Sequence, residues 1–539
     1  MTWLIAAAGG AMLAMVPGSM DQYQTPKLLA MGLAALGLLL RPSDRACYLD
    51  LPAALLAMCW VACSLFSLDR PASLTGSYLA PFDGLTAAAV YLGLMVGVAR
   101  LGATVDEVLA AVCWASLPLS GYAIAQRLVF DPLLPMPLPG GDRVIAAAGS
   151  PVYLGAVLAV VAACAMAVRH RQLGRTALLL AGVALWLTGT RGAVLAAGAA
   201  VWVLLPGRQR WAALALLPLL ALHPRALSLA ADAGRWEVWK AAWRMFLDHP
   251  ATGVGPGAFE VAFRQYVTPA FVQAHRSDFV TQQSAHNVVL QVLATGGLLG
   301  AAGAVGLAAA AWRQVRADAP ALAVLAAVLA AGLFNPLPHT ALAVAAMVLG
   351  AASSRESGFA PARSLTLAGA VAVALFVVGR VAVGDWHYGA AWRAARAGDR
   401  PGVAAALQRA ALANPWDMQV VARRVDGVLS LTGGMGMADR RLAVAACAAW
   451  SRAALARHPN DSLAHELHGR NLLAAAQLGL AVDPREALYR FRDAQRLAPT
   501  FSPVITRRRA TALLLGETAE AAAAEQDLAR VRGWAAGGA

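Results

Sequence analysis

His286 and Asn287 stand where a long hydrophilic stretch, about residues 223–286, meets the next apolar segment of the chain. The same stretch carries Arg235, and upstream a single arginine, Arg191, interrupts an apolar run. Guanidinium groups bind phosphate oxygens through paired, charge-assisted hydrogen bonds, and an imidazole exchanges protons near neutral pH. These residue types at a border between apolar and polar sequence indicate chemistry on a phosphorylated lipid.

The composition is that of a membrane protein, with 59% hydrophobic and only 14% charged residues. Apolar runs recur from Trp3 to about Val383, which predicts a membrane domain over residues 1–383 and a soluble domain over 384–539. The net charge of +14 comes from scattered arginines with no basic stripe of interleaved aromatics, so a nucleic-acid partner is not expected. The six cysteines have neither zinc spacing nor a disulfide framework, so no metal is expected.

The connections between apolar segments fall into two alternating sets. One set is short and basic, which is typical of cytoplasmic loops, and the other contains the long loops. This alternation predicts an all-α polytopic membrane protein with about 12–13 transmembrane helices. We expect a cytoplasmic N-terminus and place the 223–286 loop and the C-terminal domain outside the cytoplasm. The predicted spans are approximately 3–18, 26–40, 51–68, 83–99, 105–125, 151–168, 176–189, 192–205, 211–224, 287–312, 319–334, 340–352 and 364–383.

Residues 176–205 decide on which side of the membrane the later loops lie, because this segment can cross the membrane once or twice. A single helix of that length would greatly exceed the bilayer core, whereas two short helices hinged at Gly189-Thr-Arg-Gly192 keep the flanking basic loops on one side. Arg191 then lies at the outer membrane surface, the same side as His286. A lone interfacial arginine that extends its head group to water is the structural alternative, but the two flanking glycines favour close approach of a ligand.

Four segments together resemble the O-antigen ligase and O-antigen polymerase superfamily. His286-Asn287 is followed by nine residues and then Gly297-Leu-Leu-Gly300, as in the family's histidine motif. Thr188-Gly-Thr-Arg-Gly-Ala193 is similar to the family's Ser-Arg-Gly segment, with Thr190 in place of serine. Gly149-Ser-Pro-Val-Tyr153 and the stretch from Gly234 to Gly257 resemble two further family segments.

The resemblance implies a membrane glycosyltransferase of the bacterial cytoplasmic (inner) membrane that acts on the periplasmic face without a nucleotide, metal or other cofactor. The donor it implies is a polyprenyl-diphosphate-linked glycan. His286 matches the essential histidine and Arg191 the first essential arginine. Arg235 is the best match for the second arginine, and Arg244 and Arg264 compete for that role as additional donor- or acceptor-binding residues. Asn287 is expected to orient the imidazole or a sugar hydroxyl.

Several residues have plainer interpretations. Gly297 and Gly300 are expected to let neighbouring helices pack closely. His339 has no supporting motif and is interpreted as structural or interfacial. The tryptophans Trp236, Trp239 and Trp243 have helical spacing, which favours an amphipathic loop helix on the membrane. No spacing selects a glycosidase-like pair from the four loop carboxylates, Glu237, Asp248, Glu260 and Asp278.

The C-terminal domain resembles tetratricopeptide repeats. Alanine-rich amphipathic segments alternate with breaks at Asn414-Pro415, His458-Pro459 and Ala498-Pro499, at intervals longer than the repeat's usual ~34 residues. Such a helical domain presents a groove to a protein partner or packs on its neighbour. We therefore expect a docking domain or a cap over the loop.

Three acceptors remain open within this interpretation. A ligase would transfer the glycan to lipid A-core, a polymerase to a growing glycan, and a third type of enzyme to a protein. The histidine motif favours the ligase type, and Ser150-Pro-Val152 departs from the Gln-Pro-Asn segment of the protein-glycosylating branch. A solute transporter is the rival class, but transporters usually carry ionisable groups near the bilayer midplane and inverted repeats, neither of which is evident here.

Overall fold

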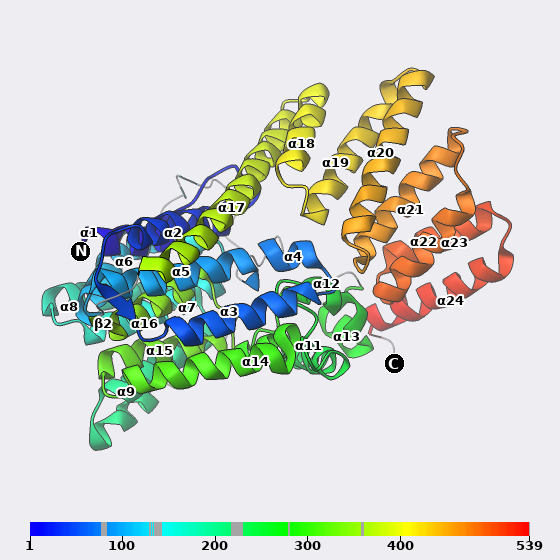
Figure 1. The fold of residues 1–539 in the computed structure, drawn as a ribbon. Helices are drawn as coiled ribbons and strands as arrows, with labels where there is room; N and C mark the ends of the chain where they lie inside the picture. The colour runs from blue at the N-terminus through cyan, green and yellow to red at the C-terminus, as the bar shows by residue number, and fades with distance from the viewer. Residues whose placement is uncertain are drawn as a thin grey trace.

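The computed structural model describes residues 1–76, 83–128, 131, 133, 143–216, 230–278, 281–356 and 361–537. It is almost entirely helical, as predicted, and its one described sheet has two short strands. A bundle of apolar helices occupies one side of the molecule and a chain of shorter helices extends from it (Figure 1). The bundle helices are α1 Thr2–Leu13, α2 Gln24–Leu39, α3 Asp50–Leu65, α5 Leu85–Leu101, α6 Val105–Leu128, α7 Pro151–Ala167, α8 Arg171–Thr188, α9 Arg191–Leu204, α14 Val288–Val315, α15 Ala319–Gly332, α16 His339–Ala352 and α17 Pro361–Arg396.

Three of these helices are long and apolar enough to cross a membrane by length and composition, namely α6, α14 and residues Leu365–Arg396 of α17. Among the described residues there are eight further apolar helices of 10–17 residues. Large apolar side chains on the outer faces remain exposed, including Met58 of α3, Val305 of α14 and Phe376 of α17. Extended apolar surface of this kind is solvated by lipid. The architecture is therefore that of an all-α membrane protein.

The hinge at Gly189 is present as predicted. Helix α8 ends at Thr188, Gly189 adopts a left-handed φ of 60° as its C-cap, and α9 begins at Arg191. Glycine adopts this conformation without the steric cost that a Cβ would bring. The span predicted at 211–224 differs, because Gly207–Leu216 forms a 3-10 helix, η3, and the rest of that span lies outside the described residues.

Short connections gather at two ends of the bundle. At the first, which we call the basic end, β1 (Arg45–Cys47) pairs antiparallel with β2 (Ser354–Glu356), and the Arg100 guanidinium donates to the Arg41 carbonyl. At the second, which we call the loop end, the Gln24 side chain donates to the Ala148 carbonyl. The basic connections at residues 41–45, 100 and 355 thus share one end, as the alternation of loops predicts.

The hydrophilic stretch and the segment after α3 fold together at the loop end. Their elements are α4 Arg70–Thr75, α11 Ala230–Asp248, α12 Phe259–Phe263, η4 Arg264–Tyr266 and α13 Pro269–His275, and η2 Ala146–Ala148, which precedes α7, lies at the same end. A small core of Val238, Phe259, Phe263 and Phe271 holds the loop helices together. The Gly253–Gly257 turn joins this core to the bundle, because the Val254 and Gly255 amides donate to the Ala294 and Thr295 carbonyls of α14.

The C-terminal helices continue from α17, which runs through the domain boundary expected at residue 383. They follow one another as sequential neighbours and return so that α24 packs against α13 (Figure 1). Helices α18, α20 and α22 end immediately before Asn414, His458 and Ala498, at the predicted proline breaks. The elements are α18 Arg400–Ala413, α19 Met418–Leu431, η5 Thr432–Gly434, α20 Met437–Arg457, α21 Ser462–Gln477, α22 Pro484–Leu497, α23 Ser502–Leu514 and α24 Thr518–Ala535.

Candidate functional site

His286 lies at the loop end in a constrained backbone conformation. Its φ is +52°, a left-handed value that a non-glycine residue adopts at an energetic cost. The Gln291 amide holds the adjoining backbone, because its oxygen accepts from the Ala285 amide at 2.8 Å and its nitrogen donates to Asp83 at 2.6 Å. Asn287 caps α14 through the Val289 and Leu290 amides and donates to the Leu333 carbonyl. The histidine is therefore fixed from both sides.

The imidazole of His286 has one satisfied and one unsatisfied nitrogen. Nε2 lies 3.2 Å from the Gln282 side-chain oxygen, and in the tautomer that donates to this oxygen the proton is on Nε2. Nδ1 then carries a lone pair, and it is buried with no hydrogen-bond partner among the described residues. Burial, and then the positive charge of Arg235, lower the pKa of His286 to about 4. The free protein thus holds a neutral imidazole at physiological pH.

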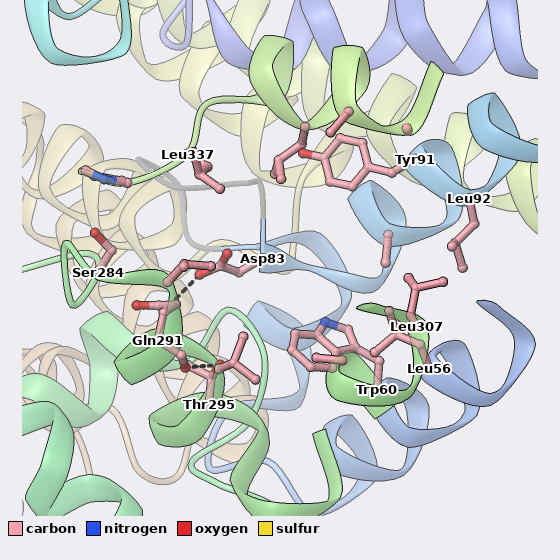
Figure 2. Close-up of a pocket in the computed structure, with 18 of the residues that line it drawn as sticks. Leu56, Trp60, Asp83, Tyr91, Leu92, Ser284, Gln291, Thr295, Leu307 and Leu337 are labelled. Carbon is pink, nitrogen blue, oxygen red and sulfur yellow. Dashed lines mark hydrogen bonds between the residues drawn. The ribbon is translucent and has the colours of Figure 1, made fainter. Parts of the chain in front are cut away.

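A largely apolar cavity of about 340 Å³ opens beside His286, between α3, α5, α14 and α16. Figure 2 shows Trp60, Leu56, Leu92 and Leu307 on one side of it and the polar group of Asp83, Gln291 and Ser284 on the other. Burial raises the pKa of Asp83 to about 6, although the Gln291 hydrogen bond opposes the shift. The cavity therefore combines a long apolar wall with a polar, titratable end.

A second cavity, of about 480 Å³, shares His286 with the first and is the more polar of the two, so we call it the polar cavity. It is lined by residues of three segments, Met20–Gln24, Gly149–Tyr153 and Gln283–His286, together with Pro336. His286 and Pro336 line both cavities. The imidazole consequently lies at the junction between an apolar and a polar compartment.

Arg191 is the first residue of α9, and although it is not among the lining residues of either cavity, its two chain neighbours contact segments that line them. The Thr190 hydroxyl donates to the Pro151 carbonyl at 3.0 Å, which ties the turn to the segment lining the polar cavity. Gly192 lies against Asn335, where an added Cβ would come within 2.5 Å of the amide nitrogen, and Asn335 lines the apolar cavity. The glycine after Arg191 is thus required for close packing.

The three loop arginines occupy different surroundings. Arg235, on α11, is partly exposed and close enough to His286 to lower the pKa of the imidazole. Arg244, on the same helix, is exposed and its charge acts on the Glu237 carboxyl. Arg264 lies instead against the C-terminal domain, where it pairs with Asp461 at 2.7 Å and with Glu260 at 3.5 Å. Of the three, Arg235 is the one whose charge acts on the His286 imidazole.

The glycines of the histidine motif contact specific neighbours. Gly297 interrupts α14 with a φ of 58°, and a Cβ there would lie 2.6 Å from the Ala251 and Gly253 backbone. The break lets the Leu298 and Leu299 amides donate to the Pro250 and Ala251 carbonyls. Gly300 faces the Trp60 ring, 3.0 Å from an added Cβ. These contacts position the helix that follows His286.

Two residues of the site escaped the sequence analysis. Asp83 reaches the apolar cavity just before α5, and Arg143 donates to the Thr188 carbonyl at 2.7 Å and to the Thr190 hydroxyl at 3.2 Å. Arg143 lies in a long loop that the predicted topology assigns to the side of His286, and Asp83 stands at the end of the predicted span 83–99 on that same side. That assignment was the only signal that could have identified them.

The structure also gives the positions of His339 and of the three tryptophans in α11. His339 is fully buried and its Nδ1 hydrogen-bonds the Tyr91 hydroxyl. Trp236 and Trp243 of α11 are 57% and 46% exposed, whereas the Trp239 indole nitrogen is buried. An exposed pair of tryptophans on one helix suits a membrane interface.

The bundle and its two joined cavities define a class, namely an all-α membrane protein with a polar site at one end of an apolar cavity. Residues 176–305 match a protein family described as O-antigen ligase, which confirms the resemblance to that superfamily. The match includes Arg191, Arg235 and His286, and it supports an enzyme of the O-antigen ligase or polymerase type in general. No curated protein matches the chain.

Proposed function

We propose that the protein transfers a glycan from a polyprenyl diphosphate to an acceptor hydroxyl, with His286 as general base and Arg191 and Arg235 holding the diphosphate. The observation that carries the proposal is the position of His286 at the junction of an apolar and a polar cavity. A lipid-linked glycan has the same order of parts, because its prenyl chain, diphosphate and sugar follow one another. The reacting bond lies between the last two.

The apolar cavity suits the part of the prenyl chain nearest the phosphates. Its volume of about 340 Å³ is near the lower end for ligand sites, so it would hold the first isoprenoid units while the remainder stays in lipid. The polar cavity of about 480 Å³, with Asp21, Gln22 and Ser150 among its lining residues, suits the first sugar of the donor. This division favours a bound donor whose anomeric carbon faces His286.

Two guanidinium groups would stabilise the leaving group. As the acceptor oxygen attacks the anomeric carbon, the bond from that carbon to the phosphate oxygen breaks and the diphosphate departs with the electron pair. Charge-assisted hydrogen bonds from Arg191 and Arg235 are each worth about 1.5–3 kcal/mol and strengthen as negative charge develops. The acceptor proton passes to the lone pair on Nδ1 of His286.

The donor itself would tune the base. Burial, and then the charge of Arg235, lower the pKa of His286, and a bound diphosphate opposes the second effect because it neutralises the guanidinium charge. The pKa of the imidazole would therefore rise above its free-protein value of about 4 in the complex, which makes the general base stronger. The base would become stronger only after the donor had bound.

We place the site on the periplasmic face of the bacterial inner membrane, with the N-terminus in the cytoplasm. The gathering of the basic connections at the opposite end of the bundle supports this orientation. We infer a ligase-type reaction with lipid A-core as acceptor. A polymerase that extends a second lipid-linked glycan uses the same chemistry, and a protein acceptor is the third outcome of the test. The C-terminal domain is proposed as a tetratricopeptide-like docking module.

The purified protein, in lipid nanodiscs with a polyprenyl-diphosphate glycan, tests the proposal. Incubation with lipid A-core, a second lipid-linked glycan or a protein acceptor should enlarge one of them and release polyprenyl diphosphate. The His286→Ala variant should do neither. Release of no polyprenyl diphosphate by wild type with any acceptor would contradict the proposal. A periplasm-active reporter enzyme fused to the C-terminus should be active, and a stable but silent fusion would reverse the orientation.

A further inference from the structure

A third cavity, of about 270 Å³, lies between the loop and the C-terminal domain. The loop contributes Glu260, Asp278 and Thr281, and the domain contributes Gln419, Thr500 and Phe501. We propose that this cavity binds a sugar unit of the acceptor glycan, so that the C-terminal domain forms one wall of the acceptor site. This inference rests on the proposed glycan transfer and identifies where its acceptor is recognised.

The lining has the chemistry of a carbohydrate site. Carboxylates such as Asp278 accept hydrogen bonds from neighbouring hydroxyls, the Gln419 amide and Thr500 hydroxyl both donate and accept, and the Phe501 ring offers a face to C–H groups. The Thr281 hydroxyl is buried and, within the described part of the chain, has no hydrogen-bond partner. A ligand hydroxyl would satisfy it.

The charges disfavour an anionic ligand. Arg264, the one lining cation among the described residues of the cavity, already pairs with Asp461 and Glu260. Glu260 and Asp278 add negative charge to the walls, and burial raises the pKa of Glu260, opposed by the charge of Arg264. A neutral, hydroxyl-rich group fits these walls, and a phosphate does not. This cavity is therefore distinct in chemistry from the proposed diphosphate site.

The cavity is connected to the imidazole through three consecutive residues. Thr281 lines this cavity, Gln282 hydrogen-bonds the His286 ring, and Gln283 lines the polar cavity that His286 shares. A glycan seated against Thr281 would therefore lie along the segment that orients the base. This arrangement suits an acceptor whose terminal sugar reaches His286 while another sugar is held by the C-terminal domain.

The wall formed by the domain is held in place by buried contacts. His458 lies 2.8 Å from Asp69, and both side chains are only 3% exposed. Asn460 donates to the Leu68 carbonyl, Arg264 pairs with Asp461, and α24 packs against α13. The two sides of the cavity therefore form one site with fixed geometry.

Steady-state transfer by the full-length protein in nanodiscs tests the inference. With saturating donor, Asp278→Asn, Phe501→Ala and the cavity-filling Gln419→Trp should each raise the KM for the acceptor about tenfold or more. Their kcat and the KM for the donor should stay within about twofold of wild type. Tyr489→Ala, which removes an exposed aromatic from the same domain, is the matched control and should change none of these values.

Equilibrium binding separates this inference from the proposed function. Two free oligosaccharides serve as probes, one released from the lipopolysaccharide core and one from the lipid-linked donor. At least one should bind wild type and Tyr489→Ala alike and bind Gln419→Trp at least tenfold more weakly, while inorganic diphosphate binds all three equally. An unchanged acceptor KM and unchanged oligosaccharide binding in folded Gln419→Trp would overturn the inference. Selective binding of an acceptor peptide in place of either oligosaccharide would also overturn it. Failure of wild type to transfer any glycan would instead overturn the proposed function, and the binding result would still decide the inference.

Discussion

Two buried histidines, His286 and His458, differ in what surrounds them. Burial, and then a neighbouring cation, lower the pKa of His286 to about 4, and Nδ1 of its ring has no partner among the described residues. Burial also lowers the pKa of His458, but the hydrogen bond and charge of Asp69 outweigh it and raise the pKa above its ordinary value. Each ring has one nitrogen without a partner among the described residues, so the two histidines differ in the charge beside them: a carboxylate pairs with His458 across an interface, whereas a cation favours the neutral form of His286.

Two of the loop arginines also differ in their surroundings. Arg264 is buried against the C-terminal domain and pairs with two carboxylates. Arg235 is partly exposed on α11, and its charge acts on the His286 imidazole. Its effect on His286 and its partial exposure favour Arg235 over Arg264 as the proposed second diphosphate ligand.

The largest expected effect comes from His286→Ala, which should lower kcat for transfer about 10²–10⁴-fold because it removes the proposed general base. The variant should fold and keep its C-terminal domain docked, since His286 makes no contact that holds the domain. Transfer assays combined with hydrogen exchange over α20 and α21 provide the measurement. Wild-type activity in a folded His286→Ala protein would contradict the proposed role of His286 as general base.

His458→Ala should have the opposite profile. The substitution leaves Asp69 buried without its partner and should destabilise docking of the domain by about 3 kcal/mol, while kcat at saturating acceptor changes only a fewfold. Because the folded-state pKa of His458 is raised, the stabilisation is complete below pH 6.5 and declines as pH rises through the folded-state pKa. Hydrogen exchange at Leu463 as a function of pH should show this decline in wild type only. A pH-independent wild type would exclude the pair as a docking contact.

Arg191→Lys and Arg235→Lys test the diphosphate site. Lysine keeps the charge but loses the paired donors, so kcat/KM for the donor should fall about tenfold or more. Arg244→Lys is the matched control, because Arg244 is exposed on the same helix as Arg235 and should tolerate the change. If Arg264→Lys lowered donor kcat/KM more than Arg235→Lys, the assignment of the two arginines would have to be exchanged.

Gly297→Ala should destabilise the protein by about 1–3 kcal/mol, because alanine is strained at a φ of 58° and its Cβ would meet the Ala251 backbone. Gly306→Ala is the control on the same helix, since nothing lies within 4 Å of its added Cβ, and it should be neutral or slightly stabilising. Thermal unfolding in detergent compares the two. Equal melting temperatures would show that the break in α14 is not required.

Much of the secondary structure could be predicted because its signals are local. The hinge at Gly189 and the helix ends before Pro415, Pro459 and Pro499 follow from glycine and proline stereochemistry. The partner of Arg264 could not be predicted, because Asp461 is 197 residues away and its pairing depends on how the domain docks. The same holds for Asp69 and His458, and for Asp83, whose hydrogen bond to Gln291 spans 208 residues.

The central claim is that His286 is a neutral base whose strength depends on the charge of Arg235 and on the bound donor. The pH dependence of transfer by wild type and Arg235→Gln tests it most directly. The base must be unprotonated to act, so activity should rise as the pH increases through the pKa of His286. For wild type, this rise should lie near pH 4 in kcat/KM for the donor and at higher pH in kcat. In Arg235→Gln, the rise in kcat/KM should occur at higher pH, because a cation that lowers the pKa of His286 has been removed. Identical pH profiles of wild type and Arg235→Gln, together with the same rise in activity with pH in His286→Ala, would contradict the proposal.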